Sequence, residues 1–219
     1  LQRLLPKLYQ SMAKRFFLQG GLKTINAREE PYEHHLACPT VVLLGLVAAA
    51  LTWGWPLVAG VIAISWSAIT RIGEVLTALR RDLVLPCDVG YASASILLKI
   101  QEPKTRFRAA RHQVARMDYT DMVCLVAEIF KRLQPHQRLW PFSVQTLRTR
   151  FRQLLRALKL PDQSTAGDRA LDLGSLRAGG ATHLLNLTED SELVRRRGRW
   201  LASRTMEIYL QESAAVTFF

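Results

Sequence analysis

Acidic residues and cysteines are scarce in this sequence of 219 residues. Eighteen Asp and Glu stand against 30 Lys and Arg, which gives a formal net charge of +12. A charge of this size favours a polyanionic partner, either nucleic acid or an anionic membrane surface. The three cysteines, Cys38, Cys87 and Cys124, form no CxxC pair, so neither a zinc finger nor a disulfide framework is supported. Such cysteine usage fits an intracellular, reducing compartment, which would be the nucleus in a eukaryote or the cytoplasm in a bacterium.

The sequence also lacks the motifs of several enzyme classes. It contains no P-loop, GxGxxG, HExxH or GxSxG pattern, and its five histidines do not have the spacing of metal ligands. Nucleotide-binding, zinc-protease and serine-hydrolase activities are therefore unsupported. With 49% hydrophobic residues the chain can bury a core. It starts at Leu1 without a signal-peptide pattern, so we expect a piece of a longer protein.

One uncharged run, residues 36–70, is long enough to cross a bilayer. A remote alternative is therefore a membrane-associated protein that is anchored by residues 36–70. The run is interrupted at Gly54, Trp55 and Pro56. Glycine is typical just after the end of one helix, and proline is typical in the first turn of the next helix. Two helices of about 13 to 15 residues would each be too short to span a membrane. We therefore expect a buried helical hairpin and no membrane partner.

Hydrophobic periodicity elsewhere predicts mostly helices. Apolar residues recur at intervals of three and four from Asp121 to just before Pro135, and after Ser143, a good N-cap. Residues 91–100 and 113–119 flank a basic polar stretch and predict a β-hairpin or a three-stranded meander. The fold class expected is mainly α with a small antiparallel β-sheet (α+β). Further helices are predicted at 1–18, 171–185, 191–197 and 202–211.

A dispersed set of basic and aromatic residues shares one chemical use. Its members are Arg71, Glu74, Lys104, Arg177, Trp200 and Tyr209. Guanidiniums can donate paired hydrogen bonds to phosphate oxygens and neutralise the charge that grows when a nucleophile attacks phosphorus. An indole N–H adds a donor, a phenol beside cations can act as nucleophile, and a lysine can supply a proton to the leaving oxygen.

The spacing of these residues resembles the tyrosine recombinase (phage integrase) family over roughly residues 37–213. In that family Arg-x-x-Glu follows two apolar helices, a Lys lies on a β-hairpin, and His-x-x-Arg opens a helix. Arg71-Ile-Gly-Glu74 and Lys104 match the first two features, and Gly174-Ser-Leu-Arg177 occupies the third. Trp200 follows Arg177 by 200 − 177 = 23 positions and precedes Tyr209 by 209 − 200 = 9, which is the spacing of the family.

The resemblance implies the catalytic-domain fold of tyrosine recombinases for residues 37–219, with residues 1–36 as the end of an N-terminal core-binding domain plus a linker. It also implies site-specific DNA recombination or integration, as in mobile elements, through a 3′-phosphotyrosine on Tyr209. Arg71 and Arg177 would clamp the phosphate, Trp200 would add a donor, Lys104 would protonate the leaving oxygen, and Glu74 would hold the site in register. No metal or other cofactor is implied; the partners are double-stranded DNA and further copies of the chain, as a tetramer on DNA.

The chain departs from the family pattern at Gly174, where the first His of His-x-x-Arg usually stands. A catalytically degenerate domain that binds DNA without cutting it is therefore the alternative function. For either function we assign duplex contacts to exposed arginines of two basic helical segments. These are Arg148, Arg150, Arg152, Arg195, Arg196 and Arg199.

Overall fold

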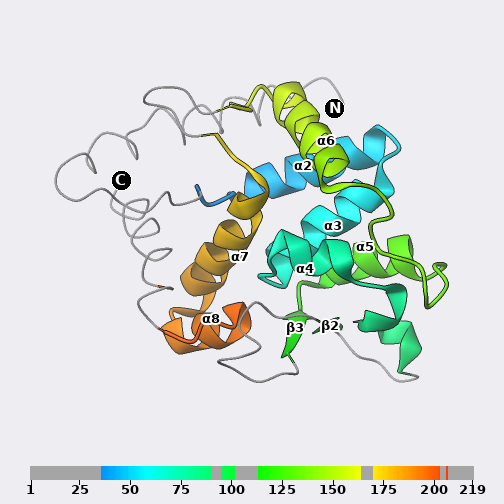
Figure 1. Cartoon of the computed structure of the whole chain (residues 1–219). Helices are drawn as coiled ribbons and strands as arrows, with labels where there is room; N and C mark the ends of the chain where they lie inside the picture. The colour runs from blue at the N-terminus through cyan, green and yellow to red at the C-terminus, as the bar shows by residue number, and fades with distance from the viewer. Residues whose placement is uncertain (1–35, 90–94, 102–112, 164–169, 203–205, 207–219) are drawn as a thin grey trace.

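The computed structural model describes residues 36–89, 95–101, 113–163, 170–202 and 206. The helices predicted at 1–18 and 202–211, the linker between residues 22 and 35, and the turn that carries Lys104 therefore lie outside the described residues, apart from isolated positions. Within the described ranges, helices make up most of the fold, and a small sheet lies at one side of them, at the bottom of the view in Figure 1. This confirms the expected fold class.

Helices α2 (Thr40–Thr52) and α3 (Pro56–Ser67) form the predicted apolar hairpin. Gly54 adopts a positive φ of 70° in the connecting turn, and Pro56 occupies the first position of α3. Helix α3 is buried from Val58 to Ser67 because it packs against α2, α5 and α7. Among the described residues, no helix combines the length and the apolar composition that a membrane crossing requires.

The sheet has three antiparallel strands in the order β1 (Leu83–Val84), β2 (Ile96–Ile100) and β3 (Gln113–Met117). Leu98 pairs with Leu83 on one side and with Ala115 on the other. Alternate residues of β2 and β3 face the core, as expected for a sheet with one buried face. The structure therefore resolves the two predicted alternatives in favour of three strands, with the third strand preceding the hairpin.

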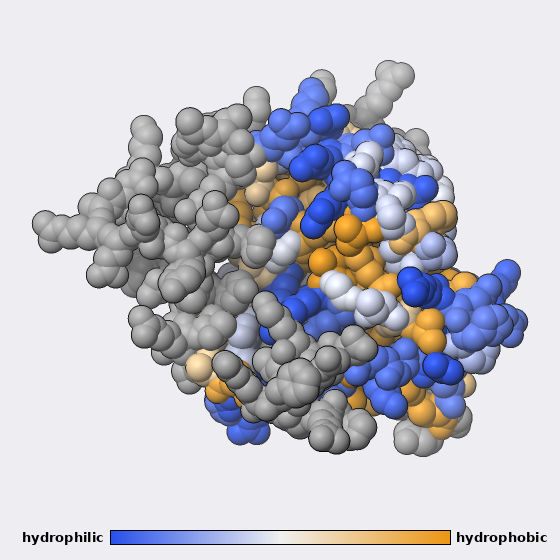
Figure 2. Space-filling view, viewed as in Figure 1, coloured by the Kyte–Doolittle hydropathy of each residue, from blue (hydrophilic) through white to orange (hydrophobic). Residues whose placement is uncertain are grey.

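Two amphipathic helices pack against the apolar hairpin. They are α5 (Thr120–Phe130) and α6 (Val144–Ala157). Ser143 is the N-cap of α6, as predicted, and its Oγ accepts a hydrogen bond of 3.1 Å from the backbone N–H of Thr146. Figure 2 shows hydrophilic residues gathered where α6 lies at the top of the view. A short helix, α4 (Ile72–Thr77), and a 3₁₀ turn, η1 (Arg80–Asp82), join α3 to β1, and a second 3₁₀ turn, η2 (Pro86–Asp88), follows β1.

Helix α7 (Leu173–Thr188) crosses the hairpin at unusually close range, and α8 (Ser191–Gly198) follows it. A Cβ atom at Gly179 would overlap the backbone of Cys38, and one at Gly180 would overlap the carbonyl of Trp66. This confirms the prediction that the small residues after Arg177 allow another part of the chain to approach α7 closely. The backbone of Cys38 is held on both sides, because its N–H donates to Ser175 O (2.9 Å) and its carbonyl accepts from Trp66 Nε1 (3.0 Å).

Candidate active site

Arg71 and Glu74 form one compact unit at the start of α4. The backbone N–H of Arg71 donates to Glu74 Oε2 (2.9 Å), and its Nη1 donates to Glu74 Oε1 (3.0 Å). The Arg71 side chain is 30% exposed and that of Glu74 is 6% exposed. The sequence-based expectation of a half-buried arginine paired with this carboxylate is thus confirmed. The Arg71 guanidinium thus binds Glu74 through one of its nitrogens, and the side chain as a whole remains partly exposed.

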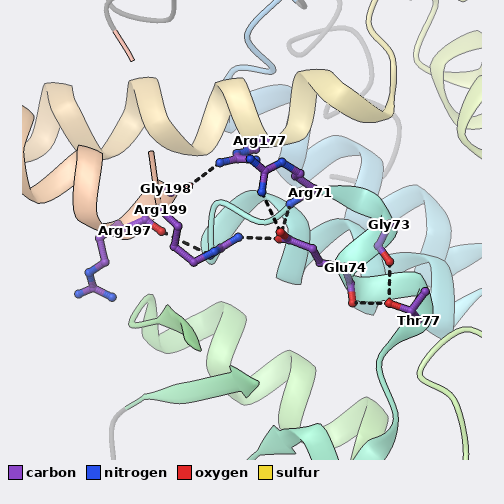
Figure 3. A network of polar contacts seen from close by, with 8 residues as sticks. All are labelled: Arg71, Gly73, Glu74, Thr77, Arg177, Arg197, Gly198 and Arg199. Atoms are coloured by element: carbon purple, nitrogen blue, oxygen red, sulfur yellow. Dashed lines mark hydrogen bonds and ion pairs between the residues drawn. The ribbon is translucent and has the colours of Figure 1, made fainter. Parts of the chain in front are cut away.

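Arg199 joins the same carboxylate from the other end of the chain. Its Nη2 donates to Glu74 Oε2 at 2.5 Å (Figure 3). The Arg199 side chain is 7% exposed. Burial lowers the pKa of Arg199, Glu74 opposes this shift, and Arg71 adds to it. Arg199 was expected on a solvated face with its arginine neighbours. Instead α8 ends at Gly198, and a left-handed φ of 57° at Arg199 turns its side chain inward.

Arg177 and Trp200 form the third part of the site. Arg177 lies on α7 and is 7% exposed, and its Nη2 donates to the carbonyl of Gly198. Its guanidinium carbon lies 4.7 Å from the centroid of the Trp200 ring, within the range of a cation–π contact. Trp200 is 5% exposed and packs against Ile69 among others. Here the indole is both a core residue and a neighbour of a candidate phosphate ligand.

A continuous set of contacts connects these residues, although they come from three distant segments. Arg177 holds Gly198, the adjacent Arg199 binds Glu74, and Glu74 binds Arg71. The cluster contains three guanidiniums and one carboxylate, which two of them bind directly, so its formal charge is 3 − 1 = +2. Such a cluster can receive an anion, and its planar donor groups fit phosphate oxygens.

Two of the predicted catalytic residues, Lys104 and Tyr209, lie outside the described residues. Gly174 is described: it lies in the first turn of α7, partly buried, and three positions before Arg177. Among the described residues no group of three or more His, Cys, Asp or Glu side chains could hold a metal ion.

The basic face of α6 has the orientation that its sequence predicts. Arg148 and Arg152 are exposed, while Arg150 is partly buried. The guanidinium carbon of Arg150 lies 5.2 Å from the ring of Trp55 and 5.3 Å from that of Phe142, and Trp140 is the third ring nearby, at 5.9 Å. Arg150 therefore packs on aromatic rings, whereas its two neighbours on the helix project into solvent.

The arginines of α8 differ from one another in their partners. Arg195 binds Glu192 through two hydrogen bonds of 2.6 and 2.7 Å and also donates to the carbonyl of Trp200 (2.9 Å). The hydrogen bonds that Glu192 accepts from Arg195 and Arg196, with the charges of both arginines, lower its pKa to about 2. Arg196 is the most exposed of the group, with 72% of its side chain accessible. Arg195 thus fixes the backbone beside the site, a role that its place in an arginine run did not reveal.

The fold is similar to those of several solved protein structures. No family model and no curated protein matches the chain. Among solved structures it is similar to the XerH site-specific recombinase bound to its difH substrate, in a pre-cleavage complex. The TM-score is 0.58 at 15% identity, over 87% of this chain and 57% of that one. The XerA recombinase gives 0.58 at 14% identity, over 85% of this chain and 62% of that one.

A third similar structure is the integrase of the Tn1549 transposon in complex with transposon right-end DNA. Its TM-score is 0.56 at 11% identity, over 92% of this chain and 72% of that one. The chain spans about three fifths of the length of the two recombinases. At these identities the likeness establishes the fold, which is that of a tyrosine recombinase catalytic domain.

Proposed function

We propose that this chain breaks and rejoins DNA as the catalytic domain of a tyrosine recombinase, with Tyr209 as the nucleophile. The observation that carries the proposal is a connected cluster: Arg71 and Arg199 bind Glu74, and Arg177 binds the carbonyl of Gly198 and packs on Trp200. A buried excess of positive charge requires an anion to complete it. The fold shared with recombinases supports a DNA phosphodiester as that anion.

The chemistry follows from the residue types. Tyr209 would lose its phenolic proton to solvent, and its oxygen would attack phosphorus and form a 3′-phosphotyrosine, while the bond to the 5′ oxygen breaks and Lys104 gives that oxygen a proton. Attack by a 5′-hydroxyl of another strand would reverse the step, so the covalent intermediate conserves the bond energy. Arg71 and Arg177 would bind the non-bridging oxygens as charge develops on them. Glu74 would hold Arg71 in register.

Duplex binding is proposed for the exposed arginines of α6 and α8. Arg148, Arg152 and Arg196 are exposed, and each can contact a phosphate without reading sequence. We extend the proposal to a tetramer of this chain on two duplexes, to an intracellular location, and to a core-binding domain that ends in residues 1–36. A measured stoichiometry on DNA other than four protomers would refute the tetramer.

A second function is favoured by one observation: Gly174 offers no side chain at the place where the family has a histidine. The domain would then bind duplex DNA through the same cluster without cutting it. Both versions predict binding that weakens steeply with salt, because many phosphates are neutralised. Covalent adduct formation separates the two functions.

The test uses a pool of randomised nicked duplexes and denaturing gels. A nick lets the freed end diffuse away, so a covalent intermediate accumulates. We expect an adduct with the chain, none with Tyr209→Phe, and an undiminished adduct with the control Tyr119→Phe. Sequencing the trapped strand would identify the target. Salt-sensitive binding without an adduct, repeated with a longer chain that includes the preceding domain, would refute the nucleophile and favour the binding domain.

A further inference from the structure

The carboxylate of Glu74 has its oxygens occupied by two arginines that lie 125 positions apart. Oε1 accepts from Arg71 Nη1 at 3.0 Å, and Oε2 accepts from the Arg71 backbone at 2.9 Å and from Arg199 Nη2 at 2.5 Å. Arg71 therefore contacts this carboxylate with one guanidinium nitrogen. Among the described residues, its Nε and Nη2 have no hydrogen-bond partner. Without a competitor, a guanidinium and a carboxylate can form two parallel hydrogen bonds, which would draw more of Arg71 onto Glu74.

Arg199 occupies its position at an energetic cost. Its charge is buried, and its backbone is in the left-handed region that non-glycine residues rarely adopt. Among the described residues its Nε has no hydrogen-bond partner. Burial also lowers its pKa. Features that oppose stability at one residue point to a role in the site instead of in folding.

We propose that Arg199 is a positioning residue that neutralises Glu74 and so leaves the charge and the outer N–H groups of Arg71 available to a phosphate. The inference rests on the proposed function, because it assigns a phosphodiester to the cluster. The charge of the cluster matches the charge of the phosphodiester in the transition state. The cluster carries 3 − 1 = +2, and a phosphodiester that a tyrosine oxygen attacks passes from one negative charge to two. Removal of Arg199 leaves 2 − 1 = +1, which is less than the two negative charges of the transition state.

Charge arithmetic also makes the test sharp. Arg199→Gln lowers the cluster to +1, whereas the double variant Glu74→Gln with Arg199→Gln returns it to +2, carried by Arg71 and Arg177. We expect Arg199→Gln to slow adduct formation on nicked duplex by about 10- to 100-fold at saturating protein. The double variant should recover most of that loss. A residue that acts through packing alone would give a double variant no faster than Arg199→Gln.

Arg80→Gln is the matched control. Arg80 is another buried arginine on a carboxylate, bound to Asp88 at 2.7 Å, but it lies outside the cluster. We expect it to lower the melting temperature and to leave the adduct rate per folded molecule unchanged. Arg199→Lys keeps the charge and serves where the glutamine variant does not fold; its rate should stay within about tenfold of the unmodified chain, since a lysine supplies a single point charge. A larger loss with Arg199→Lys would overturn the proposal.

A second readout separates this inference from the proposed function. Inorganic phosphate should raise the melting temperature of the unmodified chain and of the double variant, and should do so less for Arg199→Gln at the same concentration. If the unmodified chain forms no adduct but this order holds, the proposed cleavage fails and the inference stands. If an adduct forms at equal rates with and without Arg199, the inference is overturned and the cleavage stands. If the unmodified chain neither forms an adduct nor responds to phosphate, both are refuted.

Discussion

Replacing Gly180 by alanine tests whether the close crossing of α7 over α3, which positions Arg177, contributes to the stability of the fold. The added methyl group would overlap the backbone carbonyl of Trp66, with Ile69 Cγ1 a further 3.5 Å neighbour. A backbone atom cannot rotate away as a side chain can, so α7 must move from α3. Overpacking of a core costs typically 1–3 kcal/mol, and the rigid obstacle places Gly180→Ala near the upper end, at about 3 kcal/mol.

For a chain of this length, 1 kcal/mol corresponds to roughly 2–4 °C in melting temperature. Gly180→Ala should therefore lower the melting temperature by about 6–12 °C, measured by circular dichroism. Gly73→Ala is the control, because a Cβ at Gly73 in α4 would meet nothing within 4 Å. It should stabilise the protein by about 0.5–1 kcal/mol, since alanine favours a helix over glycine. Equal melting of Gly180→Ala and the unmodified chain, or equal losses in both variants, would refute the reasoning.

Three further predictions concern a cap, a titrating group and a DNA contact. Ser143→Ala should cost about 1 kcal/mol in urea unfolding, because the N–H of Thr146 loses its acceptor; an unchanged midpoint would contradict the capping role. Burial lowers the pKa of His183 below its ordinary value of 6.5, so the unfolded chain binds a proton more readily and stability falls as the pH drops below about 6.5. His183→Gln should melt with a shallower pH dependence between pH 7.5 and 5.5, and an identical slope would exclude His183 as the cause. Arg148→Gln should reduce the salt slope of duplex binding by about 1 while leaving the melting temperature unchanged; an unchanged slope would remove Arg148 from the interface.

Local patterns predicted most of the longer helices that the structure describes. Gly54 and Pro56 mark the break between α2 and α3, and Ser143 marks the start of α6, because each position has a local conformational requirement. The strand Leu83–Val84 was not identified, since two residues carry no periodicity and its pairing with β2 depends on tertiary structure.

The candidate site was predictable where its contacts are local. Arg71 and Glu74 stand three positions apart at a helix start, so their pairing follows from the sequence. Arg199 was grouped with the neighbouring arginines because a run of like charges usually forms a solvated face. Its inward turn depends on where α8 ends and on a carboxylate 125 positions away, and neither is visible in the run itself. A signal did exist, because Gly198 just after the helical pattern indicates a change of direction at the next residue.

The Cys38 thiol lies in a buried position, so its chemical reactivity can report on local opening of the structure. Cys38 is fully buried, and burial raises the pKa of its thiol to about 12, whereas Cys87 and Cys124 are exposed. A chain in which Cys87 and Cys124 are replaced by serine would carry one thiol, protected where α7 crosses the apolar hairpin. Its alkylation would require that crossing to open, since reaction needs an accessible thiolate. The labelling rate would therefore measure how often α7, and Arg177 with it, leaves its place beside α4.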